Sequence, residues 1–257
     1  MTVRLCFVLL RSKGAYHNIG DSMCFFKRIT AVLLLLLIVC SMGYFGKVAN
    51  ERAVSVSTIV QDEKTIILDA GHGGFDGGAS AADGTSEKDI NLNITLILAD
   101  MLRQNGYSVI LTRETDVSTD DVETDQISTR KKSDLKNRLA LMKDYPTALF
   151  VSIHLNKFTT TAANGSQVFY SPKSEGSKEL SESIQRSIIS LLQPLNTRVC
   201  KKATSSTYIL YNATIPAVLV ECGFLSNKAE LEKLKQPDYQ AQMAFCIAKG
   251  IIEFENT

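Results

Sequence analysis

A regular alternation of short apolar segments with longer amphipathic ones constrains the fold of this chain more than any other feature. The short segments predict strands at 65–69, 107–112, 148–153, 167–170, 208–211 and 217–220. The longer segments carry apolar residues at helical spacing and predict helices at 88–104, 130–143, 178–192 and 240–254. Strands that alternate with helices form a mostly parallel sheet that is covered by helices on both faces. The sequence therefore predicts an α/β fold.

The N-terminal part of the 257-residue chain differs in character from the rest. Residues 29–46 carry no charge and come after Lys27 and Arg28, a pattern typical of a signal peptide or of an uncleaved signal anchor. Positive charges before such a segment favour a cytoplasmic N-terminus and export of the remainder of the chain. We therefore expect a cytoplasmic leader at 1–28 with Met23 as the candidate true start, a membrane segment at 29–46, a linker at 47–63, and one extracytoplasmic domain at 64–257.

Charge and cysteine content exclude several classes of function. The formal net charge is +1, so no basic excess indicates binding to nucleic acid. Three of the six cysteines (Cys200, Cys222 and Cys246) lie in the predicted domain, and no Cys-x-x-Cys pair is present. The sequence therefore predicts neither a disulfide framework nor a zinc site made of cysteines.

Polar side chains of the kinds used in catalysis come after three of the predicted strands. His72 comes shortly after the strand at 65–69, His154 follows the strand at 148–153, and Glu221 follows the strand at 217–220. The third histidine, His17, lies in the leader without such partners. Ligands of open parallel sheets bind at the carboxyl ends of the strands. We therefore expect these three side chains to share one site.

Glu87 is the candidate fourth member of this site. Ser86 and Asp89 have the spacing of a capping box, which would place Glu87 at the first position of a helix. The helix dipole favours an ionised carboxylate there, and a metal ligand must be ionised.

Two histidines and one carboxylate are a known ligand set for catalytic zinc, with the fourth position left for water. His72, Glu87 and His154 therefore predict a zinc site. Zinc lowers the pKa of its water to about 7 and polarises a carbonyl group. Glu221 fits the general base that moves a proton from the water to a leaving amine. The predicted reaction is metal-assisted hydrolysis of an amide.

Each of these residues also has a simpler interpretation when it is taken alone. A single histidine after a strand is more often a hydrogen-bonded structural residue, and an acid at a helix start often serves only the helix dipole. The glycines between Gly71 and Gly78 do not have the spacing of a phosphate-binding loop. Cys222 would point away from Glu221 and fill the core.

Four ordered segments of the predicted domain carry a family resemblance. Residues 68–78, 87–92, 152–156 and 216–227 together resemble the zinc-dependent N-acetylmuramoyl-L-alanine amidases. The resemblance implies an α/β sheet flanked by helices, similar to that of phosphorylases, with zinc on His72, Glu87 and His154 and a catalytic Glu221. It also implies that the cleaved bond joins the lactyl group of N-acetylmuramic acid to L-alanine in peptidoglycan.

Within that family, residues 128–138, Leu155 and the short leader are similar to the germination-specific cortex amidases of the CwlD type. That likeness implies action on spore cortex, during formation of muramic-δ-lactam, and a lipoprotein partner. Three alternatives stay open from the sequence: a vegetative autolysin, a zinc peptidase that cuts within the stem peptide, and an inactive wall-binding protein tethered to the membrane.

Overall fold

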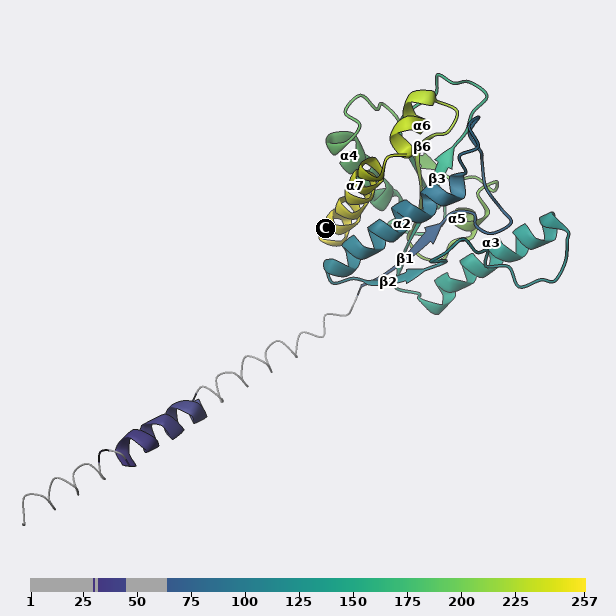
Figure 1. Ribbon diagram of the computed structural model, residues 1–257. Coiled ribbons are helices and arrows are strands. Elements are labelled where there is room, and N and C mark those ends of the chain that lie inside the picture. The colour runs from purple at the N-terminus through teal and green to yellow at the C-terminus, as the bar shows by residue number, and fades with distance from the viewer. Residues whose placement is uncertain (1–29, 31, 45–63) are drawn as a thin grey trace, which may run out of the picture. The chain divides into compact units, whose positions relative to one another are not determined.

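The computed structural model describes residues 30, 32–44 and 64–257 (Figure 1). Contacts divide the chain into two compact units, Met1–Gln61 and Asp62–Thr257. In the first unit, residues 30 and 32–44 are helical. Among all described residues, no helix combines the length and the apolarity that a membrane crossing needs. The predicted leader at 1–28, the linker at 47–63 and parts of the membrane segment at 29–46 lie outside the described residues.

A six-stranded sheet forms the centre of the second unit. Its strands are β1 (Thr65–Ala70), β2 (Ser108–Leu111), β3 (Leu149–Asn156), β4 (Gln167–Tyr170), β5 (Lys201–Lys202) and β6 (Ala217–Phe224), in the order β2-β1-β3-β6-β4-β5. All neighbouring strands pair in parallel except β4 and β6, which pair antiparallel. The prediction of a mostly parallel sheet is therefore confirmed.

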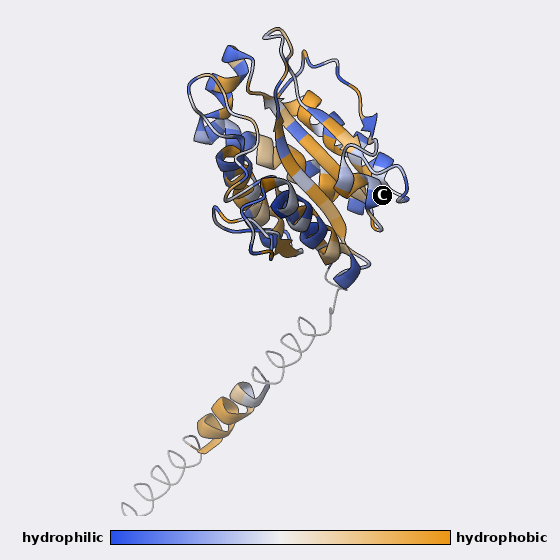
Figure 2. Cartoon of the chain, turned by 90° about the vertical axis from the view of Figure 1, so that its right-hand side faces the viewer, coloured by the Kyte–Doolittle hydropathy of each residue, from blue (hydrophilic) through white to orange (hydrophobic). Residues whose placement is uncertain are grey.

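Helices cover both faces of this sheet. They are α2 (Glu87–Gln104), α3 (Ile127–Asp144), α4 (Ser177–Leu191), α5 (Tyr208–Asn212), α6 (Lys228–Leu234) and α7 (Pro237–Glu255). On β1, Ile66 and Leu68 join the apolar cluster of α2, α4 and α7, whereas Ile67 joins the cluster of α3 and α5. This division arises because successive side chains of a strand point to opposite faces of the sheet. Figure 2 shows the strands coloured largely as hydrophobic, while the helices carry many hydrophilic residues.

The strand predicted at Tyr208–Tyr211 is wrong, because this segment forms helix α5. The amide of Tyr211 donates to the carbonyl oxygen of Thr207 at 3.0 Å, which is a helical hydrogen bond. Ile209 and Leu210 are both buried although they are adjacent, which suits one helical turn packed on the sheet. A short apolar run fits a strand and a buried helical turn equally well, so periodicity alone did not separate them.

Two further elements were not predicted, the two-residue strand β5 and helix α6. Helix α6 is mostly polar and buries only Leu231 and Leu234. Its start is fixed by Asn227, whose side chain accepts hydrogen bonds from the amides of Ala229 and Glu230.

Candidate functional site

The carboxyl ends of β1, β3 and β6 meet at one edge of the sheet and bring three predicted site residues together. Strands β3 and β6 run further than predicted, so His154 and Glu221 lie within them instead of after them. The two residues are direct partners in the parallel register. Their side chains therefore lie side by side on one face of the sheet. Because Leu155 and Cys222 belong to the cluster under α2, α4 and α7, that face is the one covered by α3 and α5.

Glu87 is the first residue of α2, as the sequence predicts, but the capping box is wrong. The side chain of Ser86 accepts no capping hydrogen bond, and its hydroxyl instead donates to the carbonyl oxygen of Gly77 at 2.9 Å. The amide of Glu87 donates to the carbonyl oxygen of Ala79 at 2.9 Å. The backbone of the preceding loop thus takes the role that the serine side chain was expected to play.

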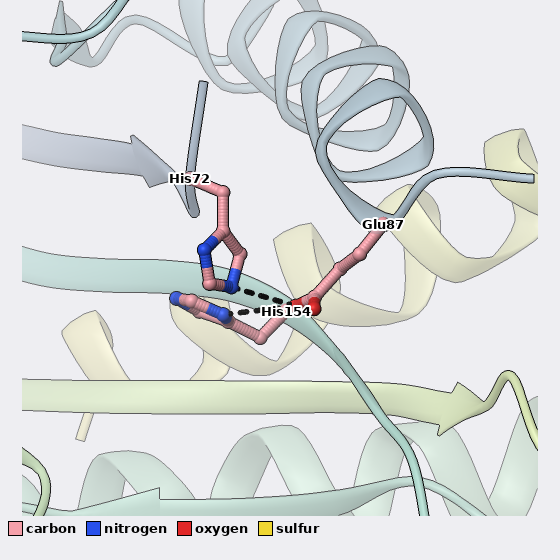
Figure 3. Close-up of side chains that lie close together, drawn as sticks. All are labelled: His72, Glu87 and His154. Atoms are coloured by element: carbon pink, nitrogen blue, oxygen red, sulfur yellow. Dashed lines mark hydrogen bonds and ion pairs between the residues drawn. The ribbon is translucent and has the colours of Figure 1, made fainter. Parts of the chain in front are cut away.

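His72, Glu87 and His154 converge on one point (Figure 3). Oε1 of Glu87 lies 3.2 Å from Nε2 of His72 and 3.1 Å from Nδ1 of His154. Glu87 is 3% exposed, and the amide of Leu155 also donates to Oε1 at 3.0 Å. These contacts lower the pKa of Glu87 although burial opposes the shift, so the carboxylate is ionised.

The three side chains fit a divalent metal ion. Their candidate ligand atoms all lie within 4.8 Å of one another. A tetrahedral zinc ion with bonds of about 2.0–2.1 Å separates its ligand atoms by roughly 3.3 Å, which is close to the two imidazole–carboxylate distances. Two neutral nitrogen donors and one carboxylate are also the donor chemistry that zinc accepts at a catalytic centre.

The approach of His154 depends on a glycine in the neighbouring loop. A Cβ atom at Gly71 would lie 2.3 Å from Cε1 and 2.4 Å from Nε2 of the His154 ring. Any larger residue at this position would displace the ring. Part of the glycine-rich sequence near His72 therefore makes room for an imidazole.

Asp76 is a site residue that the sequence interpretation missed. Its Oδ2 lies 2.9 Å from Nδ1 of His72, so Asp76 holds the ring nitrogen that faces away from Glu87. Burial lowers the pKa of His72, but the bonds to Asp76 and Glu87 outweigh it and raise the pKa to about 9. A carboxylate on the outer nitrogen of an imidazole orients the ring and makes the inner nitrogen more basic. The spacing of four residues between His72 and Asp76 was the only signal in the sequence.

Glu221 lies beside this cluster, and its carboxyl group is buried without a hydrogen-bond partner for one oxygen, Oε2, among the described residues. Burial raises the pKa of Glu221 to about 7, and the neighbouring Glu87 also raises it. A carboxyl group with such a pKa exchanges protons near neutral pH. Cys222 is fully buried in the apolar cluster on the other face, as predicted.

A cleft of about 240 Å³ opens next to the histidines. His72 and His154 line it together with Lys131 and Leu135 of α3 and Ile209 of α5. The cleft therefore reaches the two imidazoles from the face covered by α3 and α5.

Comparison with protein-family models finds one family along nearly all of the second unit. The family described as N-acetylmuramoyl-L-alanine amidase matches residues 66–253. All four predicted site residues lie within this range. The germination-specific N-acetylmuramoyl-L-alanine amidase of Bacillus subtilis is 37% identical over 191 residues, which cover 74% of this chain and 79% of that protein.

Solved structures show the same architecture. The CwlD amidase from Clostridioides difficile, determined in complex with the GerS lipoprotein, is 43% identical with a TM-score of 0.72, over 75% of this chain and 98% of that chain. The amidase AmiC2 of Nostoc punctiforme is 30% identical with a TM-score of 0.65, over 76% of this chain and 98% of that chain.

Proposed function

The chain belongs to the N-acetylmuramoyl-L-alanine amidase family and acts on peptidoglycan, and we propose that it does so at a zinc centre made by His72, Glu87 and His154, with Glu221 as the general base. The observation that carries this proposal is the convergence of the three ligand-type side chains beside a buried carboxylate without a hydrogen-bond partner. Each of the four comes from a different part of the chain, so their convergence depends on the complete fold.

When bound, zinc supplies Lewis acidity, which polarises the scissile carbonyl group and makes water a better nucleophile at neutral pH. Glu221 accepts a proton from the attacking water as the water oxygen bonds to the lactyl carbonyl carbon. The bond from that carbon to the nitrogen of L-alanine then breaks, and Glu221 delivers the proton to this nitrogen. One carboxyl group can do both steps, because Glu221 holds the proton only between them.

The remaining residues hold and orient this machinery. Asp76 fixes the ring of His72, and the amides of Ala79 and Leu155 fix the two oxygens of Glu87. A group locked by several hydrogen bonds requires no rearrangement during the reaction.

The substrate that we propose is the peptidoglycan of the spore cortex, where removal of the stem peptide precedes muramic-δ-lactam formation. Two relatives support this choice, the germination-specific amidase of Bacillus subtilis and the CwlD amidase. The second was solved together with a lipoprotein, and we propose that a lipoprotein of this kind also binds this chain. Export by the segment 29–46 would bring the enzyme to the same compartment.

Digestion of purified cortex and of vegetative wall peptidoglycan by the zinc-loaded protein tests this proposal. We expect free amino groups of L-alanine to appear, and to appear faster from cortex. A new amino end further along the stem peptide would indicate a peptidase instead. Equal rates on both materials would indicate a general autolysin, and no release from either would indicate a wall-binding protein without activity.

A further inference from the structure

Two buried arginines hold the loop that carries His72 by its backbone. Arg113 donates from Nε to the carbonyl oxygen of Ala70 at 2.9 Å and from Nη2 to that of Gly71 at 3.1 Å. Arg138 donates from Nη1 to Ala70 at 2.9 Å and from Nη2 to the carbonyl oxygen of His72 at 2.7 Å. Three consecutive carbonyl groups are thus each bound by a guanidinium group.

Arg113 also reaches the helix that carries Glu87. Its Nη2 donates to the carbonyl oxygen of Lys88 at 2.8 Å. Lys88 is the residue after Glu87 in the first turn of α2. One guanidinium group therefore joins the loop of one candidate metal ligand to the helix of another.

The two arginines differ in how their charges are balanced. Arg138 pairs with Asp69 at 2.5 Å and with Asp134 at 2.8 Å. Arg113 is 3% exposed, and within residues 64–257 no carboxylate forms an ion pair with it. Burial lowers the pKa of Arg113, as does the charge of Arg138. Burial of a cation that has only carbonyl partners lowers the stability of the fold. The role of Arg113 therefore lies in the directions of its hydrogen bonds, because it makes no ion pair with a carboxylate.

The loop is also packed directly against the Arg113 side chain. A Cβ atom at Gly73 would lie 2.9 Å from both Cδ and Nε of Arg113. His72, one residue earlier, is the only residue other than glycine with a positive φ among those described, at 63°. A residue with a side chain keeps such a conformation only where the surroundings enforce it. The arginine contacts supply that enforcement.

We propose that Arg113 is a positioning residue that sets the separation between the imidazole of His72 and the carboxylate of Glu87, by tying their two backbone segments to one planar group. This inference rests on the proposed function in one respect, that these two side chains hold a metal ion. The role requires the fork of a guanidinium group, because the contacts to Ala70, Gly71 and Lys88 leave in different directions within one plane. A lysine at this position keeps the charge but cannot make these contacts together.

The test compares Arg113→Lys with the parent protein and with the matched control Arg103→Lys. Arg103 lies near the end of α2, is largely exposed and contacts Asp100 at 3.5 Å. The zinc dissociation constant is measured by competition with a chelator, and the geometry of the metal site by the visible spectrum after cobalt(II) substitution. We expect Arg113→Lys to bind zinc about 10–100-fold more weakly and to alter the cobalt spectrum. We expect Arg103→Lys to match the parent in both.

Thermal unfolding of the metal-free proteins separates positioning from folding. We expect metal-free Arg113→Lys to unfold cooperatively, and KM for peptidoglycan to stay near the parental value while kcat falls. Parental zinc affinity with a parental cobalt spectrum would overturn the inference. Loss of cooperative unfolding in the metal-free variant would also overturn it, because Arg113 would then support the fold itself.

The same measurements distinguish failure of this inference from failure of the proposed function. A parent protein that binds no zinc would reject both. A parent that binds zinc but releases no L-alanine ends would reject the proposed reaction, while the comparison of Arg113→Lys with the parent would still decide the positioning role.

Discussion

The imidazole of His72 is constrained on both of its nitrogens. Nε2 faces Glu87 at 3.2 Å, and Nδ1 faces Asp76 at 2.9 Å. Lys131 in turn lies 2.9 Å from the other oxygen of Asp76. Asp76 therefore remains ionised, and its pKa is lowered by His72 and Lys131 against the effect of burial. At the scale of single residues, the cluster of His72, Glu87 and His154 is thus continued outward by Asp76 and Lys131.

Removal of this outer carboxylate should weaken metal binding without unfolding the protein. We expect Asp76→Ala to raise the zinc dissociation constant about 10–100-fold, because His72 loses the group that orients its ring. Chelator competition measures the change. Asp116→Ala is the matched control, since Asp116 accepts a hydrogen bond from Gly74 of the same loop but does not touch His72. Equal losses in the two variants would contradict an orienting role for Asp76.

The proposed role of Glu221 as general base is tested by a substitution that preserves the shape of the side chain. A glutamine has almost the same volume but cannot accept the proton of water, so we expect Glu221→Gln to lose about 10²–10⁴-fold in kcat. The variant should retain zinc, because Glu221 is not among the three clustered ligands. Release of L-alanine ends and the zinc content of the purified variant are the two measurements. Hydrolysis at the parental rate would show that another group is the base.

The four candidate site residues could be proposed from the sequence, whereas the residues that support them could not. His72, His154 and Glu221 could be grouped because each is close to the end of a local apolar segment, and local patterns are readable. Arg113 and Arg138 act on backbone carbonyl groups of a loop that is distant in sequence. No pattern of side-chain types reports such contacts, so only the folded chain reveals them.

At the scale of elements, α4 and α7 pack unusually closely. A Cβ atom at Gly250 of α7 would lie 2.5 Å from Cα and 2.9 Å from the backbone nitrogen of Ile184. The hydroxyl of Ser183 in α4 also donates to the carbonyl oxygen of Gly250 at 2.8 Å. Glycine therefore allows the two helix backbones to touch.

This contact gives helix propensity and packing opposite effects on stability. Replacement of a helical glycine by alanine gains about 1 kcal/mol in propensity, but overpacking costs about 1–3 kcal/mol, and here the clash is with backbone. We expect Gly250→Ala to lower the free energy of unfolding by about 2 kcal/mol in urea titrations. Gln242→Ala, at an exposed position of α7, should change it by less than about 0.5 kcal/mol. A more stable Gly250→Ala protein would refute the close contact.

Helix α5 shows why elements were predicted less well than the overall class. Its five residues contain Tyr208 and Ile209, which favour strands, yet the segment is helical because the buried surface of α3 and the sheet accepts one turn there. Helix α6 was missed for the opposite reason, since its polar sequence carries almost no apolar periodicity. In α5 the tertiary environment outweighs local preference, whereas in α6 local propensity and the Asn227 cap agree with the structure.

On the scale of the whole molecule, one buried ion pair links the centre of the sheet to α3. Arg138 of α3 is 2% exposed and lies 2.5 Å from Asp69 of β1, which is 1% exposed. Burial raises the pKa of Asp69, but the charge of Arg138 and the hydroxyl of Ser152 outweigh it and lower the pKa to about 2. The unfolded chain has a value near 3.8.

A lowered pKa makes stability depend on pH in a defined direction. The ionised Asp69 contributes about 2 kcal/mol above pH 4, and this contribution is lost as the pH falls from about 4 to about 2. The Asp69→Asn variant should be less stable than the parent at neutral pH. Between pH 4 and pH 2, however, its free energy of unfolding should fall by about 2 kcal/mol less than that of the parent, as measured by urea titrations. Parallel losses in the two proteins would show that other groups govern acid unfolding.

The class of the fold was predictable, because the spacing of apolar residues within a short segment indicates a strand or a helix. The order of the strands in the sheet was not predictable in this way. Strand β6 lies between β3 and β4, and β4 pairs with it antiparallel. These pairings depend on contacts between strands and helices that are far apart in the sequence, and local apolar spacing does not report such contacts. The candidate site residues were nevertheless predicted to lie together, because β1, β3 and β6 are parallel and present the same ends to one edge.

The position of β6 also sets when the candidate site can be completed during synthesis of the chain. The three ligand-type residues have all left the ribosome once His154 emerges, but β3 then lacks its neighbour on one side. Ala217–Phe224 is translated more than sixty residues later, and it brings both the missing partner of β3 and Glu221. A growing chain that has not yet added Ala217–Phe224 therefore lacks both the neighbour of β3 and the fourth candidate site residue, so the candidate site can be assembled only after this strand has been made.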